Sequence, residues 1–243
     1  MCRMMGIVAP HGVDAEHVAR FRQQARGHVP SGDTPGHADG WGIVHYEGGR
    51  PAYTARSTAD ALTDPLYEGA LDELRKRRPT GPLLAHVRKA SAGAVSVENT
   101  HPFTSGRWAF CHNGTVFGLA SPGESDSRAL FALLLRELDA GAAPREAIAA
   151  VAERVSALRY TSLTFLLTDG RALWGVRKLG NVDEECREGA CDRDYYTLGV
   201  ARIGDQTVVS QEHEFLAIDA WHVVPDGHVV VVPPDGHPRI EAI

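Results

Sequence analysis

Residues 162–168 read SLTFLLT, an apolar run with almost no polar alternation. Such a run predicts a short strand that is covered on both faces. Two adjacent segments before it, 126–138 (DSRALFALLLREL) and 144–158 (PREAIAAVAERVSAL), have the apolar spacing of amphipathic helices. A helix pair of this kind is a suitable cover for one face of a sheet, so the sequence predicts a layered sandwich of sheets and helices.

Other short apolar or alternating runs between turn residues predict the remaining strands. They are MMGIVA (4–9), WGIVHYE (41–47), PLLAHV (82–87), WAFCH (108–112), ALWGV (172–176), YYTLGVA (195–201), TVVSQ (207–211) and HVVVVP (228–233). A third helix is predicted over 64–77. Residues 27–40 and 180–194 are rich in Gly, Pro or charge and are predicted to be loops.

Length and composition indicate an ordinary globular chain. The 243 residues can form one domain, and hydrophobic residues at 43% with charged residues at 23% are near the globular average. The net charge of -6 gives no basic surface for nucleic acid or anionic lipid. No apolar run approaches the roughly 18 residues of a membrane span, and the amino terminus lacks an export signal. We therefore expect a cytoplasmic protein with no membrane or nucleic-acid partner.

Four cysteines in a chain without an export signal are expected to be free thiols. Cys186 and Cys191 lie farther apart than a CxxC pair and have no second pair to complete a zinc site. We expect a polar loop there, with a metal site as the minor alternative.

Cys2 follows the initiator methionine, and its small side chain permits removal of Met1. The cysteine would then carry both a thiol and an α-amine. A terminal amine titrates at about pH 7.7, so it can accept a proton at neutral pH and serve as the base for its own nucleophile. The alternative is an incidental cysteine at the start of a strand.

Acyl transfer also needs hydrogen-bond donors for the developing oxyanion. After the strand WAFCH, the amide of Asn113 and the backbone N–H of Gly114 can point at one spot, although HNG by itself is also a common turn. Arg88, after PLLAHV, could bind a carboxylate with two hydrogen bonds, or form a surface ion pair. Asp126 could face an ammonium group, but Asp or Ser in ESDS is also a good helix N-cap.

Taken in order, Cys2-Arg3, HADGWGI (37–43), AHVRKAS (85–91), ENTHPFT (98–104), HNG (112–114) and SDS (125–127) resemble class II glutamine amidotransferases. In particular, the chain resembles the stand-alone YafJ-like group, through HADGWGIVHYEG at 37–48 and ENTHPFT. The motifs cover residues 2 to about 130. The resemblance implies an α+β class protein, a four-layer αββα sandwich of two mainly antiparallel sheets with the Ntn-hydrolase fold, as one domain over residues 2–243.

The resemblance also implies a role for each matching residue. Cys2 would be the nucleophile and its α-amine the base, with the Asn113 side chain and the Gly114 backbone as the oxyanion hole. Arg88 would bind the α-carboxylate of the substrate and Asp126 its α-ammonium group. His101 would line the pocket or order the loop over it, or be an ordinary hydrogen-bonded histidine. Asp39, Gly40 and Trp41 would shape the turn near the nucleophile, with Trp41 as a core residue in the alternative.

The sequence departs from synthase-linked members after Arg88, where their Thr-His pair is replaced by Ser91-Ala92; Ser91 still offers a hydroxyl to the substrate. We expect a glutamine or γ-glutamyl amide substrate and no metal or cofactor. Because no synthase domain follows, ammonia would pass to a synthase in trans, or the enzyme would hydrolyse a γ-glutamyl bond as in ergothioneine synthesis. A glutamine-sensing module is a second class. A metal-dependent hydrolase is a third, although the spacing of His11, His17, His28, His37 and His45 does not support it.

Overall fold

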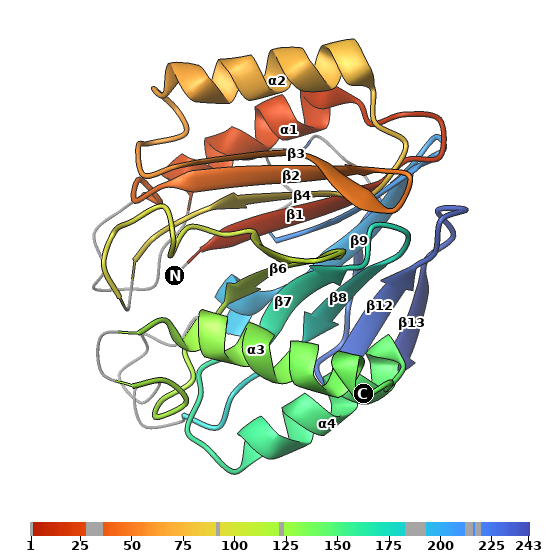
Figure 1. Cartoon of the computed structure of the whole chain (residues 1–243). Coiled ribbons are helices and arrows are strands. Elements are labelled where there is room, and N and C mark those ends of the chain that lie inside the picture. Colours follow the sequence, from red (N-terminus) through yellow and green to blue (C-terminus); the bar gives the residue numbers. More distant parts are fainter. Residues whose placement is uncertain are drawn as a thin grey trace.

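The computed structural model describes residues 2–27, 36–90, 93–121, 124–182, 193–211, 216 and 220–243. Within them the chain forms two antiparallel sheets lying face to face, with helices on both outer sides (Figure 1). The loops predicted at 27–40 and 180–194 fall largely outside these residues, as do Ser91, Cys186 and Cys191.

The first sheet has seven strands in the order β11-β9-β10-β1-β4-β2-β3. Their bounds are β1 Arg3–Val8, β2 Trp41–Glu47, β3 Arg50–Ser57, β4 Leu83–Val87, β9 Gly199–Ile203, β10 Gln206–Ser210 and β11 His222–Val223. Strand β1 pairs with β10 on one side and β4 on the other. The segment that follows Cys2 is therefore held in the interior of a sheet.

The second sheet has six strands in the order β13-β12-β8-β7-β6-β5. Their bounds are β5 Phe103–Ser105, β6 Trp108–Asn113, β7 Thr164–Thr168, β8 Leu173–Arg177, β12 His228–Val232 and β13 Arg239–Ala242. Strand β7, predicted from SLTFLLT, lies between β6 and β8 and is buried along its whole length.

Four α-helices form the outer layers (Figure 1). Helices α1 (Ala15–Phe21) and α2 (Pro65–Arg77) cover the first sheet, and α3 (Asp126–Asp139) and α4 (Pro144–Ser156) cover the second; short 3-10 helices span Arg22–Arg26 and Arg193–Tyr196. The three predicted helices are confirmed within two residues. No helix among the described residues is long and apolar enough to cross a membrane.

Alternating side chains of the strands divide the apolar interior into three layers. In β1, Met5 and Ile7 face the α1 and α2 side, whereas Met4 and Val8 pack between the two sheets. In β7, Phe165 and Leu167 pack with the residues of α3 and α4, whereas Leu166 joins the layer between the sheets. Both faces of these strands are covered, so every position of β1 and β7 is buried and the residues in their middle are apolar or glycine. The predicted four-layer αββα sandwich is confirmed.

Candidate active site

Cys2 lies immediately before β1, close to the amino terminus that Figure 1 marks. Its side chain is buried, at 7% exposure. The Cys2 backbone nitrogen donates a hydrogen bond of 2.9 Å to Oδ1 of Asn113, and its thiol lies 3.6 Å from the carbonyl oxygen of Lys89. The thiol is thus placed between the end of β4 and the end of β6.

Asn113 is the last residue of β6, in the opposite sheet. Its Oδ1 accepts from the Cys2 nitrogen, so its Nδ2 faces Oε1 of Gln211 and donates to it at 3.2 Å. A side-chain amide has two N–H groups, and within the described part of the chain Gln211 is the partner of one of them. The fold therefore brings together the predicted nucleophile and the predicted oxyanion donor, which are 111 residues apart in the sequence.

Gly114 follows Asn113 at a place where no side chain fits. A Cβ atom there would lie 2.1 Å from the carbonyl oxygen of Ser162 and 2.8 Å from Nε2 of His112. Glycine is required because the β6 end passes so close to the segment before β7. The close approach fixes the backbone next to Asn113, as an oxyanion hole requires.

Arg88 directly follows β4 and is 4% exposed. Its backbone nitrogen donates to the Gly40 carbonyl at 2.8 Å, and its own carbonyl accepts from Asp39 at 3.0 Å. Nη2 donates to the carbonyl oxygen of Ala94 at 3.2 Å. The Asp39 carboxylate accepts from Ala90 nitrogen at 2.8 Å. Asp39 and Gly40 thus hold the backbone around Arg88 in place through hydrogen bonds, which agrees with the turn-shaping role predicted for them. Arg88 itself is buried and does not lie on the surface.

Trp41 belongs to the core. It is fully buried, its Nε1 donates to Asp64 at 2.9 Å, and its ring meets Tyr67 edge-on at 4.8 Å. Of the two readings, the core role is the one these contacts support.

His101 is buried against His86 of β4. Nδ1 of His101 lies 3.0 Å from Nε2 of His86 in a hydrogen bond, and the two rings meet edge-on. Burial, reinforced by nearby positive charge, holds the pKa of both imidazoles well below the usual value, so both are neutral near pH 7. Gly42 permits this packing, because a Cβ there would lie 2.1 Å from the His101 carbonyl oxygen.

Asp126 is the first residue of α3, and the N-cap is its neighbour Ser125, whose side chain accepts from the backbone nitrogen of Arg128. The Asp126 carboxylate accepts from the backbone nitrogen of Val116 at 2.8 Å. This bond ties the start of α3 to the segment following Gly114. The contact with an ammonium group remains a prediction.

His112 was not singled out from the sequence, yet it joins the same two segments. Its Nε2 lies 3.1 Å from the Ser162 carbonyl oxygen, which can only accept, so Nε2 carries the proton. Nδ1 then accepts from the hydroxyl of Ser127 at 2.9 Å. The side chain therefore locks the end of β6 to α3.

Arg3, Tyr195 and His37 form a second group that sequence reasoning missed. Arg3 Nη1 and the Tyr195 hydroxyl both donate to the Cys2 carbonyl oxygen, at 3.2 and 3.4 Å. The Arg3 guanidinium lies 3.7 Å from the centre of the Tyr195 ring, and His37 Nε2 lies 3.1 Å from the Tyr195 hydroxyl. Burial, followed by the charge of Arg3, lowers the pKa of His37 to about 3. These donors fix the peptide that carries the thiol.

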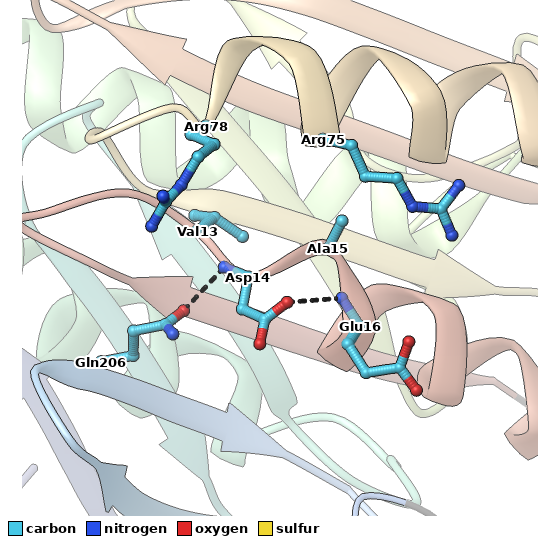
Figure 2. Close-up of a pocket in the computed structure, with 7 residues that line it drawn as sticks. All are labelled: Val13, Asp14, Ala15, Glu16, Arg75, Arg78 and Gln206. Atoms are coloured by element: carbon cyan, nitrogen blue, oxygen red, sulfur yellow. Dashed lines mark hydrogen bonds between the residues drawn. The ribbon is translucent and has the colours of Figure 1, made fainter.

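A separate pocket of about 450 Å³ lies beyond the other end of β1 (Figure 2). It is lined by Val13, Asp14, Ala15, Glu16, Arg75, Arg78 and Gln206. Figure 2 shows the Asp14 backbone nitrogen bound to Gln206 Oε1 and the Glu16 nitrogen bound to the Asp14 carboxylate. None of the predicted site residues lines this pocket, so it is distinct from the Cys2 site.

Solved structures share this architecture. Glutamine phosphoribosylpyrophosphate amidotransferase from B. subtilis superimposes with a TM-score of 0.69 at 18% identity, covering 99% of this chain and 49% of that one. This likeness, together with the two packed antiparallel sheets, places the chain among proteins with the N-terminal nucleophile hydrolase fold.

The sequence comparisons define the family. The sequence pattern of the family of class II glutamine amidotransferases matches residues 1–186, more than half of the chain. YafJ of Escherichia coli, which carries the name of a glutamine amidotransferase, is 37% identical over 119 residues, 44% of this chain and 45% of that protein. The γ-glutamyl-hercynylcysteine sulfoxide hydrolase of Mycobacterium tuberculosis is 38% identical over 80 residues, 32% of each chain. The chain belongs to the class II glutamine amidotransferases, and these two alignments span less than half of either relative.

Proposed function

We propose that the chain hydrolyses the side-chain amide of glutamine or of a γ-glutamyl amide, with Cys2 as its nucleophile after removal of Met1. The observation that carries the proposal is the 2.9 Å hydrogen bond between the Cys2 nitrogen and Asn113, which holds a buried thiol beside an amide donor. A nucleophile adjacent to preorganised oxyanion donors is the minimum arrangement for acyl transfer.

The proposed first step forms a bond between Cys2 Sγ and the amide carbon of the substrate. The thiol proton passes to the Cys2 α-amine, and the negative charge on the carbonyl oxygen is held by the free N–H of Asn113 and the backbone N–H of Gly114. The carbon–nitrogen bond then breaks, and the protonated α-amine gives its proton to the departing ammonia or amine. Water hydrolyses the resulting γ-glutamyl thioester, releasing glutamate and restoring the thiol.

The remaining predicted residues would recognise the amino-acid head group of the substrate. Arg88 supplies a buried guanidinium that matches a carboxylate in geometry and charge. Asp126 would face the ammonium group. Ser91, which lies outside the described residues, would add a hydroxyl. His101 would order the segment that carries it through its bond to His86.

The proposed activity can take two forms, which differ in the group that leaves the substrate: ammonia from glutamine, or a larger amine from a γ-glutamyl amide. Likeness to the mycobacterial hydrolase supports a γ-glutamyl amide of a larger metabolite, whereas the family itself supports glutamine, with ammonia passed to a synthase supplied in trans. Comparing the release of glutamate from glutamine and from γ-glutamyl amides of increasing size distinguishes the two, because kcat/KM measures how well each transition state is bound.

Intact-mass measurement with diazo-oxo-norleucine tests the proposal itself. We expect the protein from cells to lack Met1 and to gain one adduct on Cys2. A chain that keeps Met1, or that reacts elsewhere, would favour the glutamine-sensing alternative. Cys111, the other buried free thiol among the described residues, serves as the internal control.

A further inference from the structure

The Cys2 thiol and two histidines form a cluster of three potential metal ligands. Cys2, His86 and His101 each offer one donor atom, these atoms lie within 4.8 Å of one another, and all three side chains are buried. They come from the segment before β1, from β4 and from the segment before β5, so no sequence spacing connects them.

We propose that Cys2, His86 and His101 form an inhibitory site for a thiophilic divalent cation, with Zn²⁺ as the best match. The ion would bind the sulfur that attacks the substrate and so prevent attack. The inhibitory part rests on the proposed function, whereas the binding part rests on the three ligands alone.

The chemistry of the donors selects the metal. Thiolate with imidazole is a ligand set that favours Zn²⁺ over Mg²⁺ or Ca²⁺, which prefer oxygen. With bonds of about 2.0–2.1 Å to nitrogen and about 2.3 Å to sulfur, tetrahedral ligands lie about 3.3–3.6 Å apart. Side-chain shifts of about 1 Å would bring the three atoms from their present separation to this geometry.

The two imidazoles are placed as a metal needs. They lie next to each other and to the thiol, and one nitrogen of each ring takes part in the bond between them. Nδ1 of His86 and Nε2 of His101 have no hydrogen-bond partner among the described residues. Where an ion takes a nitrogen that now joins the rings, metal bonds would replace the 3.0 Å hydrogen bond between them.

The release of a proton and the neighbouring positive charge determine how tightly the site would bind a cation. Binding forms a metal–sulfur bond and releases the thiol proton to solvent, one proton for each ion. The buried guanidinium of Arg88 interacts electrostatically with both histidines, so its positive charge opposes a cation at this place. We therefore expect reversible binding that a chelator removes, weaker than in a structural zinc site.

The experiment titrates Zn²⁺ into the full-length processed protein and follows bound metal by calorimetry and glutamate release from glutamine in parallel. We expect one ion for each chain, activity that falls in proportion to occupancy, and recovery with a chelator. Co²⁺ serves as a second probe, because a cobalt–thiolate bond gives a near-ultraviolet charge-transfer band.

Variants locate the ion. Cys2→Ala, His86→Gln and His101→Gln should each weaken binding at least about tenfold, since even outer-shell partners of a metal contribute about 10- to 100-fold. His45→Gln is the matched control, because His45 is also a buried neutral histidine and lies in β2 outside the cluster. A Cys186→Ser/Cys191→Ser double variant tests the competing thiols and should leave the affinity unchanged.

Each outcome decides one proposal. The inference is overturned if the wild type binds no Zn²⁺, or if Cys2→Ala binds it as tightly as the wild type. It is also overturned if the affinity for Zn²⁺ is lost in the Cys186→Ser/Cys191→Ser variant. These results count even where glutaminase activity is present. Stoichiometric binding that requires Cys2, in a protein without glutaminase activity, supports the metal site and overturns the proposed function instead. Because Cys2→Ala removes a single sulfur atom, it keeps the test decisive where a histidine variant does not fold.

Discussion

Asn113→Asp separates the proposed role of Asn113 as oxyanion donor from its role in the packing of the site. The carboxylate keeps an oxygen for the Cys2 nitrogen, which now lies 2.9 Å from Oδ1, but loses the N–H groups. The side-chain amide of Gln211 faces the second carboxylate oxygen of the variant. It can rotate to present Nε2 to that oxygen, because Nε2 has no partner among the described residues. The variant should therefore fold while lacking the donor.

The expected loss of kcat follows from the role of that donor. Removing one oxyanion-hole hydrogen bond typically costs about 2.7–4 kcal/mol of transition-state stabilisation, a factor of about 10²–10³. Asn113→Ala should show a similar loss of kcat together with lower stability. The alanine leaves the buried Cys2 nitrogen and Gln211 oxygen without their present partner, at about 1–3 kcal/mol for each group.

Steady-state glutamate release measures the loss of kcat, and urea unfolding measures the loss of stability. Asn181→Ala is the control, because Asn181, an exposed residue after β8, likewise accepts from a backbone nitrogen, that of Tyr160, and donates through its Nδ2, here to the backbone carbonyl of Leu158. It should lose about 1 kcal/mol of stability and keep its kcat. A folded Asn113→Asp protein with a kcat within about tenfold of the wild type would refute the reasoning.

Further changes test other parts of the structure. Arg88→Lys should raise KM about ten- to hundredfold with little change in kcat, because bonds between charged groups contribute about 1.5–3 kcal/mol in ground and transition states alike; an unaltered KM would reject Arg88 as the anchor. Gly114→Ala should lower the unfolding free energy in urea by about 1–3 kcal/mol, because its Cβ would lie 2.1 Å from a carbonyl oxygen. In α2, Gly69→Ala meets no atom outside its own helix within 4 Å and should raise that free energy by about 1 kcal/mol; equal signs for the two glycines would contradict the packing argument. The unfolded chain protonates His37 below its ordinary pKa of 6.5, whereas the folded pKa is about 3, so stability falls as pH falls through this window. His37→Gln should remove about 2 kcal/mol of the stability difference between pH 7 and pH 5, and urea curves with an unchanged difference would speak against it.

The layered fold could be predicted because buried strands and amphipathic helices have strong patterns. SLTFLLT predicted a strand of the second sheet that is covered on both faces, and the helix pair that begins at Asp126 predicted the cover of one of these faces. WGIVHYE matches β2 over its full length. Strand β3 was missed because it is a half-exposed edge strand containing Pro51, which an edge tolerates. Helix α1 was missed because its seven residues are too short for a clear period.

The site was predicted only where short motifs carry it. Cys2, Asn113 and Gly114 were proposed from their chemistry and assigned roles by the resemblance, and the structure brings Cys2 and Asn113 together. Gln211 and His86 were missed because each lies in an ordinary strand sequence, and its role depends on which distant strand pairs beside it. The single-domain boundary, the cytoplasmic location and the individual substrate contacts stay predictions.

The hydrogen bond between Cys2 and Asn113 crosses from one sheet to the other. The distance between the thiol and the proposed oxyanion donor is therefore set by the thickness of the side-chain layer that separates the sheets. Gly6 of β1 shows how tight that spacing is, because a Cβ there would lie 2.6 Å from Leu173 of β8. Substitutions in this layer should consequently tune turnover from positions that never meet a substrate, and a screen for altered specificity would do well to include them.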